Sequence, residues 1–525
     1  MSIQEFAAHN KRVFGGKRPS EKAQSVILLE LNNLGSAHIA YSYFARAMAD
    51  LSGARLVAYD PEVRTHWSSW VFRQKNSLKK KKIKEVYESF GVGEFLQINP
   101  SLTRFLRAHQ LAVQLKDNIQ TKRSIEKLKI KGIRIGDLLY DSYLKDLRRP
   151  TIRLESKEWF LYLRRFLNHF LFWEKFFTDH QVAAVNASHC VYELAIPLRM
   201  AVFRDVPAFQ VNVTHAYRLG KKNLFAYNDF FSFPREFQKI PVGERKKGIQ
   251  EAKKRIGRRF KGEVGVDMDY SKKSAFGKIS NKKLLKKSSR KKILVATHCF
   301  FDSPHSYGDN VFPDFYEWLE FLGKISKKTN YEWYIKTHPD YLPGTLEIIQ
   351  SFIRRYPRFC LLPSDTSHHQ IIQEGIDLAL TVYGTIAFEY ALLGVPVLNA
   401  SRNNPHAAYS FNLHAGSAAK YKNLLLNPKI FHHKIPKSQV YEYYFMKHIF
   451  NTENIFFKNY EKTIFELGGY EHQFGPEVYR MWMNEWSAEK HELILKTFRR
   501  FILSGDFRMN GDHLPISALQ KKGRA

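Results

Sequence analysis

A lysine and a histidine stand close together in the stretch IKTHPD (335–340), directly after a predicted buried strand. Ligands of α/β proteins bind at the carboxyl ends of the strands, so Lys336 and His338 lie where a ligand is expected. The lysine can neutralise a phosphate, and the histidine can donate a hydrogen bond to it or act as an acid. Pro339 fixes the loop backbone. A surface lysine beside a helix-capping histidine is the alternative interpretation.

A second stretch, TVYGTIAFEYALLGVPVLNA (381–400), combines a strand, a tight turn and a helix. We predict that the strand ends at Tyr383, that Gly384 permits the turn, and that Thr385 caps the helix. The helix N-terminus then offers free N–H groups to a phosphate. Glu389 follows one turn later on the same face, where its carboxylate can accept two ribose hydroxyls. An ordinary capped helix with a solvent-facing Glu389 is the alternative.

A third stretch, residues 297–319, crowds His298, Asp302, His305 and Asp309 just after the first strand of the second predicted domain. Such a cluster could bind substrate or supply the general base that deprotonates an acceptor hydroxyl. A polar loop held by local hydrogen bonds is one alternative. A metal site built from the four residues is another, although their spacing matches no strong metal signature, and we expect neither a metal nor a cofactor.

The first two stretches, taken in order, resemble the capsule and surface polysaccharide biosynthesis glycosyltransferases. That group includes bacterial Kdo transferases and polysialyltransferase-like enzymes. The resemblance covers roughly residues 291–415 and does not extend to the N-terminal half. The residues that carry it are Lys336, His338, Pro339, Thr381, Gly384, Thr385, Glu389, Gly394, Pro396 and Val397.

The resemblance implies an α/β fold of the GT-B type, with two Rossmann-like domains facing a cleft and C-terminal helices. It implies a nucleotide-sugar donor in the C-terminal domain and a glycan or glycolipid acceptor in the N-terminal one. The donor phosphate would contact His338 and the turn threonine, and the nucleotide would contact Glu389. The H-P pair favours a CMP-activated acidic sugar such as Kdo. The expected donor-binding residues are His298, Lys336, Tyr383, Gly384, Thr385, Glu389, Asn404 and His406; the catalytic candidates are His338, Asp302, His305 and Asp309.

Polar residues also follow predicted strands of the N-terminal half. Asn33 and His38 come after the strand SVILLEL (25–31), and His189 comes after VAAVNAS (182–188). The carboxyl ends of parallel strands share one edge of a sheet, so we expect these three residues on the acceptor side. Helix caps and loop hydrogen bonds are the alternative.

Strand and helix patterns alternate in two blocks, which predicts two Rossmann-like domains. We predict an acceptor domain with a helical insertion over 1–240 and a nucleotide-sugar domain over 291–435. The highly basic stretch 241–290 between them is predicted to be a solvated linker, or a basic strip over a membrane or an anionic glycan. Residues 436–525 form a C-terminal helical segment. The Asp-Met-Asp at 267–269 resembles a metal-binding DxD but lies in this basic stretch, so we discount it.

The 525 residues carry 83 Lys+Arg and 50 Asp+Glu, a net charge of +33 that attracts polyanions without selecting one. Three scattered cysteines fit a reducing compartment. The polar N-terminus and the lack of a long apolar run predict a cytoplasmic protein, with an anionic membrane surface as an additional partner. The run KKKKIK (79–84) fits a solvated helix face better than a nucleic-acid site.

Two other functions compete with glycosyl transfer. One is a nucleotide-sugar epimerase or a polyol-phosphate transferase on the same fold. The other is a non-enzymatic basic protein that binds nucleic acid or membranes, for which only the charge argues. We expect a nucleotide sugar as ligand and no nucleic acid.

Overall fold

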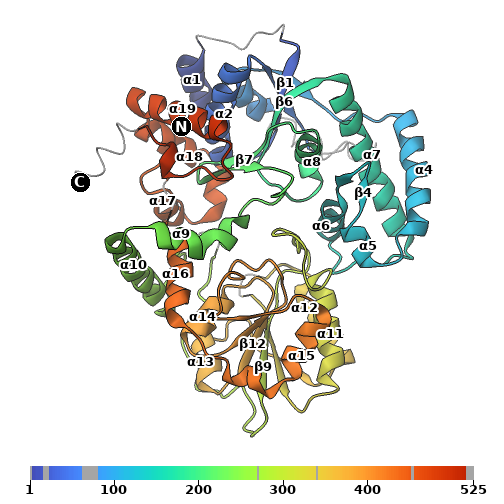
Figure 1. Ribbon diagram of the computed structural model, residues 1–525, viewed down its shortest axis with the longest axis vertical. Coiled ribbons are helices and arrows are strands. Elements are labelled where there is room, and N and C mark those ends of the chain that lie inside the picture. The colour runs from blue at the N-terminus through green and yellow to red at the C-terminus, as the bar shows by residue number, and fades with distance from the viewer. Residues whose placement is uncertain are drawn as a thin grey trace. The chain divides into compact units, whose positions relative to one another are not determined.

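The computed structural model describes residues 3–15, 23–61, 81–268, 271–338, 341–450 and 454–515. The chain divides into two compact units (Figure 1). Unit 1 comprises Met1–Leu139, Arg153–Ala226 and Asn451–Ala525, and unit 2 comprises Tyr140–Ile152 and Tyr227–Phe450.

Unit 1 is built on a six-stranded sheet with the order β3-β2-β1-β6-β7-β8. All neighbours are parallel except β7 and β8, which are antiparallel. Counted along the sheet, this is the Rossmann order 3-2-1-4-5-6. The strands are β1 (Ser25–Glu30), β2 (Arg55–Tyr59), β3 (Val92–Leu96), β6 (Gln181–Ala187), β7 (Ala208–Asn212) and β8 (His215–Leu219), with a separate hairpin of β4 (Lys129–Ile130) and β5 (Ile133–Arg134).

Helices cover the sheet of unit 1 because its central strands are apolar on both faces: Val26 to Leu29 of β1 are fully buried. Helix α2 packs against β7 and against the C-terminal helices α18 and α19, which come from the far end of the chain. The helices are α1 (Ile3–Phe14), α2 (Gly35–Ser52), α4 (Leu102–Asn118), α5 (Lys122–Glu126), α7 (Lys157–Asp179), α8 (Ile196–Phe203), α17 (Tyr460–Glu466), α18 (Glu477–Glu485) and α19 (Ala488–Ser504); α6 (Gly136–Leu147) begins in unit 1, and its residues from Tyr140 onward belong to unit 2.

Unit 2 repeats the Rossmann order in a second six-stranded sheet, β11-β10-β9-β12-β13-β14, whose neighbours are all parallel. The direction of strand succession reverses between β9 and β12, which makes this the topological switch point. The strands are β9 (Lys292–Ala296), β10 (Glu332–Lys336), β11 (Phe359–Leu361), β12 (Leu378–Thr381), β13 (Val397–Asn399) and β14 (Leu413–His414).

The core of unit 2 forms where apolar residues of β9, β10 and β12 meet the apolar face of α11, including Trp318 and Leu322. Asp314 starts α11 by accepting the backbone N–H of Glu317 at 2.7 Å, an N-cap bond. The helices are α9 (Phe233–Lys239), α10 (Val242–Phe260), α11 (Phe315–Ser326), α12 (Thr345–Arg355), α13 (His368–Gln373), α14 (Ile386–Leu392), α15 (Ala418–Leu426) and α16 (Lys437–His448).

The predicted fold class is confirmed, because the chain contains two α/β units that each have a Rossmann-type sheet. The segment boundaries differ from those we predicted. The stretch 241–290 contains α10, which packs on α16 through Gly248, Ala252 and Ile256, spaced four residues apart on one face. The C-terminal segment divides, because α16 belongs to unit 2 while residues 451–525 belong to unit 1.

In the part of the chain that the structure describes, no helix has both the length and the apolar character needed to cross a bilayer.

Candidate functional site

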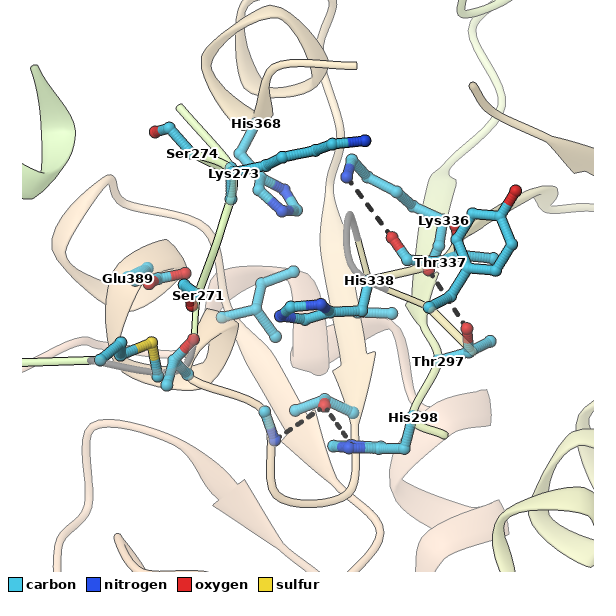
Figure 2. Close-up of a pocket in the computed structure, with 18 of the residues that line it drawn as sticks. Ser271, Lys273, Ser274, Thr297, His298, Lys336, Thr337, His338, His368 and Glu389 are labelled. Carbon is cyan, nitrogen blue, oxygen red and sulfur yellow. Dashed lines mark hydrogen bonds between the residues drawn. The ribbon is translucent and has the colours of Figure 1, made fainter. Parts of the chain in front are cut away.

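A cavity of about 460 Å³ opens at the carboxyl edge of the sheet in unit 2 (Figure 2). Its walls come from the residues that follow β9, β10 and β12, from the start of α14, from the end of α10 and from the segment 263–276. Residues after β9 and β12 flank the topological switch point, where open α/β sheets bind their ligands. The volume lies within the range of about 300–1,000 Å³ typical of small-molecule sites.

Lys336, the last residue of β10, places a buried ammonium group in the cavity wall. It is 1% exposed, and its Nζ donates a 2.9 Å hydrogen bond to the backbone carbonyl of Ser364. Burial lowers the pKa of Lys336 to about 8, while the nearby carboxylates of Asp365 and Glu389 act in the opposite direction. A buried cation of this kind is costly in an empty site and is stabilised by an anion beside it.

His298, which follows β9, holds the turn after β12 in place. Its Nε2 accepts the backbone N–H groups of Val382 and Tyr383, each at 3.2 Å, and lies 3.1 Å from the Thr381 hydroxyl. Two N–H donors require an unprotonated Nε2, so the ring proton sits on Nδ1. Desolvation lowers the pKa of His298 to about 4, with a smaller lowering effect from His338, so the ring is neutral near pH 7.

The turn itself closes through the Thr381 side chain, whose hydroxyl accepts the backbone N–H of Gly384 at 3.2 Å. A Cβ at position 384 would lie 2.7 Å from this hydroxyl, so the tight turn requires glycine. Thr385 occupies the N-cap position of α14, but its side chain makes no cap bond. Instead, its hydroxyl lies 3.5 Å from Nη2 of Arg259.

Glu389 of α14 is 1% exposed and pairs with Arg259 at the end of α10, where Nε donates to Oε1 at 2.6 Å. The alternative of a solvent-facing glutamate is therefore wrong. Arg259 also lies 3.4 Å from the backbone carbonyl of Val266, so it joins α10, α14 and the segment 263–276 at one point. The same carboxylate also acts electrostatically on Lys336, whose pKa it raises.

Three further groups with acid, base or donor chemistry line the cavity: His338, His368 and Asp302. Figure 2 shows His338 projecting into the centre of the view from the loop after β10. His368 is buried and neutral, because desolvation lowers its pKa well below the usual value, and its Nδ1 lies 2.8 Å from the Tyr390 hydroxyl. Asp302 is exposed, and its Oδ1 accepts the backbone N–H of Ser303 at 2.8 Å.

The structure thus gathers eight of the predicted site residues around one cavity: His298, Asp302, Lys336, His338, Tyr383, Gly384, Thr385 and Glu389. Pro339, the remaining member of the H-P pair, lies outside the described residues. Four predicted residues of unit 2, His305, Asp309, Asn404 and His406, do not line the cavity.

His305 is fully engaged elsewhere in unit 2. It is 1% exposed, its Nδ1 lies 2.5 Å from Oδ1 of Asp141, and its ring packs against Tyr140. Tyr140 and Thr151 donate to the carboxylate of Asp314 at 2.5 and 2.6 Å. These bonds fasten residues 140–152 to the start of α11, and His305 lies against the same segment, outside the cavity lining.

The other three residues support the loops behind the cavity. Asn404 is fully buried, and its Nδ2 donates a 2.7 Å hydrogen bond to the carbonyl of Val382, the residue after β12. Asp309 accepts a bond from the Asn403 side chain through its backbone carbonyl. His406 is buried against Tyr443, and desolvation lowers its pKa well below the usual value.

The alternative of a metal site built from His298, Asp302, His305 and Asp309 is not supported, because only the first two line the cavity. Across the described residues, no group of three or more His, Cys, Asp or Glu side chains is arranged to hold a metal ion. Asp267 of the DxD-like stretch pairs instead with Arg255 at 2.8 Å and with the Tyr444 hydroxyl, and Asp269 lies outside the described residues.

The three predicted acceptor-side residues lie in unit 1. His38 is buried, with Nδ1 2.6 Å from the Tyr479 hydroxyl and Nε2 3.0 Å from the carbonyl of Asn32. Burial lowers its pKa to about 4, so it is a neutral part of the packing around the loop after β1. Asn33 and His189 are exposed, after β1 and β6, which are neighbouring parallel strands.

Sequence reasoning missed the contribution of the basic stretch to the cavity. Arg259, Ser271, Lys273, Ser274 and Phe276 all line it, and none was a candidate. One signal was available: small and apolar residues recur every four positions through 248–256, which predicts a packed helix within the charged run.

No protein-family model and no curated protein matches the chain. Solved structures of similar fold include the KpsC beta Kdo 2,4 transferase of Thermosulfurimonas dismutans, at 12% identity over 50% of this chain and 79% of that one, with a TM-score of 0.29. A glycosyltransferase from Rickettsia africae is 8% identical over 88% of this chain and 100% of that one, with a TM-score of 0.23. The UDP-GlcNAc 2-epimerase of Neisseria meningitidis is 10% identical over 82% and 94% of the two chains, with a TM-score of 0.21. At such TM-scores these similarities carry no functional argument.

Proposed function

We propose that the protein is a glycosyltransferase that binds a nucleotide-activated sugar in the cavity of unit 2 and transfers the sugar to a surface glycan or a lipid-linked glycan. One observation carries the proposal: a cavity at the switch point of a Rossmann-type sheet contains the buried ammonium group of Lys336. The position favours a nucleotide, and the cation favours its phosphate.

The charges around Lys336 support an anionic ligand. Glu389 pairs with Arg259 at 2.6 Å, so its charge is shared between that arginine and the ammonium group of Lys336, on which Asp365 also acts. Lys273 and His338 line the same cavity. A phosphate placed among these groups would gain charge-assisted hydrogen bonds and would offset the cost of burying Lys336.

The transfer can be written with the groups that line the cavity. The acceptor hydroxyl attacks the anomeric carbon of the sugar, and the bond from that carbon to the donor phosphate oxygen breaks. The phosphate leaves with the electron pair, stabilised by Lys336 and His338. The hydroxyl proton passes to a base, for which Asp302 is the exposed carboxylate of the cavity wall among the four catalytic candidates.

Two finer features belong to the same proposal. A CMP-activated acidic sugar such as Kdo is the proposed donor, supported by the two lysines of the lining, Lys273 and Lys336. Neutralisation of the leaving phosphate by side-chain cations is proposed to suffice without a metal ion, which an activity assay with and without EDTA tests directly.

Nucleotide binding is tested by thermal shift with CMP, CDP, UDP and GDP. We expect at least one nucleotide to stabilise the wild type and to lose this effect in His338→Ala. The matched control is His432→Ala, which removes an exposed histidine of the same unit outside the cavity. Failure of all four nucleotides to stabilise the wild type would contradict the proposal.

Product mass distinguishes transfer from the competing reactions. An acceptor that gains the mass of one sugar supports glycosyl transfer. Consumption or isomerisation of the donor without that gain supports an epimerase, and a gain of a polyol phosphate supports the other transferase.

A further inference from the structure

A basic strap, defined as residues 277–291 (GKISNKKLLKKSSRK), contains seven Lys/Arg and no Asp/Glu. A run of like charges of this kind is usually solvated and disordered, because the charges repel one another and few apolar groups are available for burial. In this protein the strap is fixed to unit 2.

Side chains of unit 2 bind the backbone of the strap. Gln370 accepts the backbone N–H of Ser280 at 3.0 Å and donates to the carbonyl of Lys282 at 2.8 Å. Glu374 accepts the N–H groups of Leu284 and Leu285 at 2.8 and 2.7 Å. These bonds satisfy the polar backbone groups that an irregular segment leaves unpaired, so the strap has a defined course.

Six of the seven cationic side chains of the strap are exposed, and four of these recur every four residues, at Lys278, Lys282, Lys286 and Arg290. The seventh, Lys291, is partly buried and pairs with Asp377 at 2.8 Å. Leu285, by contrast, is buried in the core between α13 and the sheet. The strap therefore presents a series of positive charges along a path whose other side is anchored.

The strap leads away from the cavity. Ser271, Lys273 and Phe276, just before it, line the cavity, and the carbonyl of Ala275 accepts the N–H of His368 at 3.0 Å. From there the contacts follow α13 to Glu374, and Ser288 then reaches Glu332, the first residue of β10. The series of cations runs from the carboxyl edge of the sheet to its amino edge.

We propose that the strap binds an acidic glycan, a linear polyanion whose end reaches the cavity. The identification of this glycan as the acceptor rests on the proposed function. The binding of the glycan to the strap does not depend on it. A linear series of cations that begins at the cavity suits a chain that reacts at its end. The regular four-residue spacing supplies one cation or pair at intervals of at most about 13 Å along an extended backbone.

Two other polyanions fit the strap less well. Surfaces that bind membranes combine cations with several apolar side chains that insert, whereas the strap exposes one large apolar side chain, Ile279, at 48%. Single-stranded nucleic acid is bound by aromatic side chains that stack on bases, and the strap sequence contains none.

The test measures binding of a fluorescein-labelled oligogalacturonate by anisotropy, with no nucleotide sugar present. The strap variant is Lys278→Gln/Lys282→Gln/Lys286→Gln/Lys287→Gln. The control variant removes four exposed lysines elsewhere in unit 2: Lys324→Gln/Lys328→Gln/Lys420→Gln/Lys434→Gln. Both variants lower the formal net charge from +33 by four, to +29, so a difference between them reports position and not total charge.

We expect the strap variant to bind the oligogalacturonate about tenfold more weakly, as four exposed charge contacts of a few tenths of a kcal/mol each would give. The control variant should bind as the wild type does, and the uncharged methyl ester of the probe should not bind. Thermal unfolding of both variants should match the wild type.

Equal weakening in the two variants, or equal binding of the methyl ester, overturns the proposal. So does strap-dependent binding of phosphatidylglycerol vesicles or of single-stranded DNA without binding of oligogalacturonate. The nucleotide thermal shift is recorded on the same samples, because it should be unchanged in the strap variant. If the wild type binds the acidic glycan but no nucleotide, the proposed function is contradicted while the glycan site is supported.

Discussion

Replacing Lys336 by methionine should stabilise the ligand-free protein at pH 7 while removing the anion site. The lysine is 1% exposed, and its pKa falls from 10.5 to about 8 because the charged form is desolvated. At about 1.4 kcal/mol for each unit of pKa, burial of the charge costs the folded state about 3 kcal/mol. Methionine avoids this cost but leaves the Ser364 carbonyl without its 2.9 Å hydrogen bond, a loss of about 1–3 kcal/mol. The net expectation is a gain of about 1 kcal/mol.

The sign of this effect reverses with pH. Between pH 8 and about 10.5 the lysine of the unfolded chain keeps its proton while that of the folded protein loses it. The unfolded state then binds more protons, so the stability of the wild type rises with pH relative to the variant. The advantage of Lys336→Met is therefore fully present below pH 8 and is replaced by a deficit of about 2 kcal/mol near pH 10.5.

Urea unfolding followed by circular dichroism at pH 7, 8, 9 and 10 measures this difference. Lys324→Met, which replaces an exposed lysine on α11, is the control and should run parallel to the wild type. A difference in unfolding free energy between wild type and Lys336→Met that does not change with pH would contradict the lowered pKa of Lys336. The same samples test nucleotide binding. Nucleotide should stabilise the wild type at pH 7 and should stabilise it progressively less above pH 8, whereas it should not stabilise the variant at any pH.

Three further outcomes follow from the same wall. Arg259→Met removes the ion-pair partner of the buried Glu389 carboxylate and should lower the free energy of unfolding by about 3–5 kcal/mol. The double variant Arg259→Met/Glu389→Gln should recover most of this loss of stability in urea unfolding. If the losses of the two single variants simply add in the double variant, the pairing is contradicted. Gly384→Ala places a Cβ 2.7 Å from the Thr381 hydroxyl and so disturbs the turn in the cavity wall. Calorimetry should show a loss of nucleotide affinity of at least about tenfold, and the free energy of unfolding should fall by about 1–3 kcal/mol. The pKa of His298 is lowered to about 4, so acidification from pH 6.5 to 4 protonates the unfolded ring first, and this residue should contribute about 3 kcal/mol to the loss of stability. His298→Gln should remove that contribution and leave the part that comes from other buried histidines, such as His38 and His368. A stability profile unchanged by the substitution would contradict the lowered pKa of His298.

The sheets were predictable because their strands are short, buried and separated by amphipathic helices. The runs around Val26 and Ile293 are apolar on both faces, which a central parallel strand requires. The same logic located the site, since residues after neighbouring parallel strands meet at one edge. Lys336, His298 and Glu389 therefore converge although they lie far apart in sequence.

The sequence does not predict contacts between residues that lie far apart along the chain, because no local pattern indicates which distant residues meet. His305 was a catalytic candidate because it belongs to the cluster of polar residues just after β9, yet its partner is Asp141, 164 residues earlier. Asn404 and His406 follow a strand as predicted, but they turn inward and fill the space behind the cavity. Burial of a polar side chain depends on such distant partners. The position of a residue in a loop after a strand therefore does not tell whether it lines the cavity or packs behind it.

The basic stretch was predicted wrongly for a different reason. Its high content of lysine and arginine indicated a solvated linker, although parts of it are ordered. Counted as charge, residues 241–290 predict a linker, yet Arg259 pairs with Glu389 and the strap backbone is bound by Gln370 and Glu374. The positive charge is thus held in place by buried or partly buried acceptors of unit 2, while the lysines of the strap other than Lys291 stay exposed. Under the proposed function, a fixed cationic surface that begins at the cavity would raise the local concentration of polyanions at the place where they react. If the strap binds an acidic glycan as proposed, the position of its lysines should matter more to binding than the total number of lysines in the chain, and the two fourfold variants compare these directly.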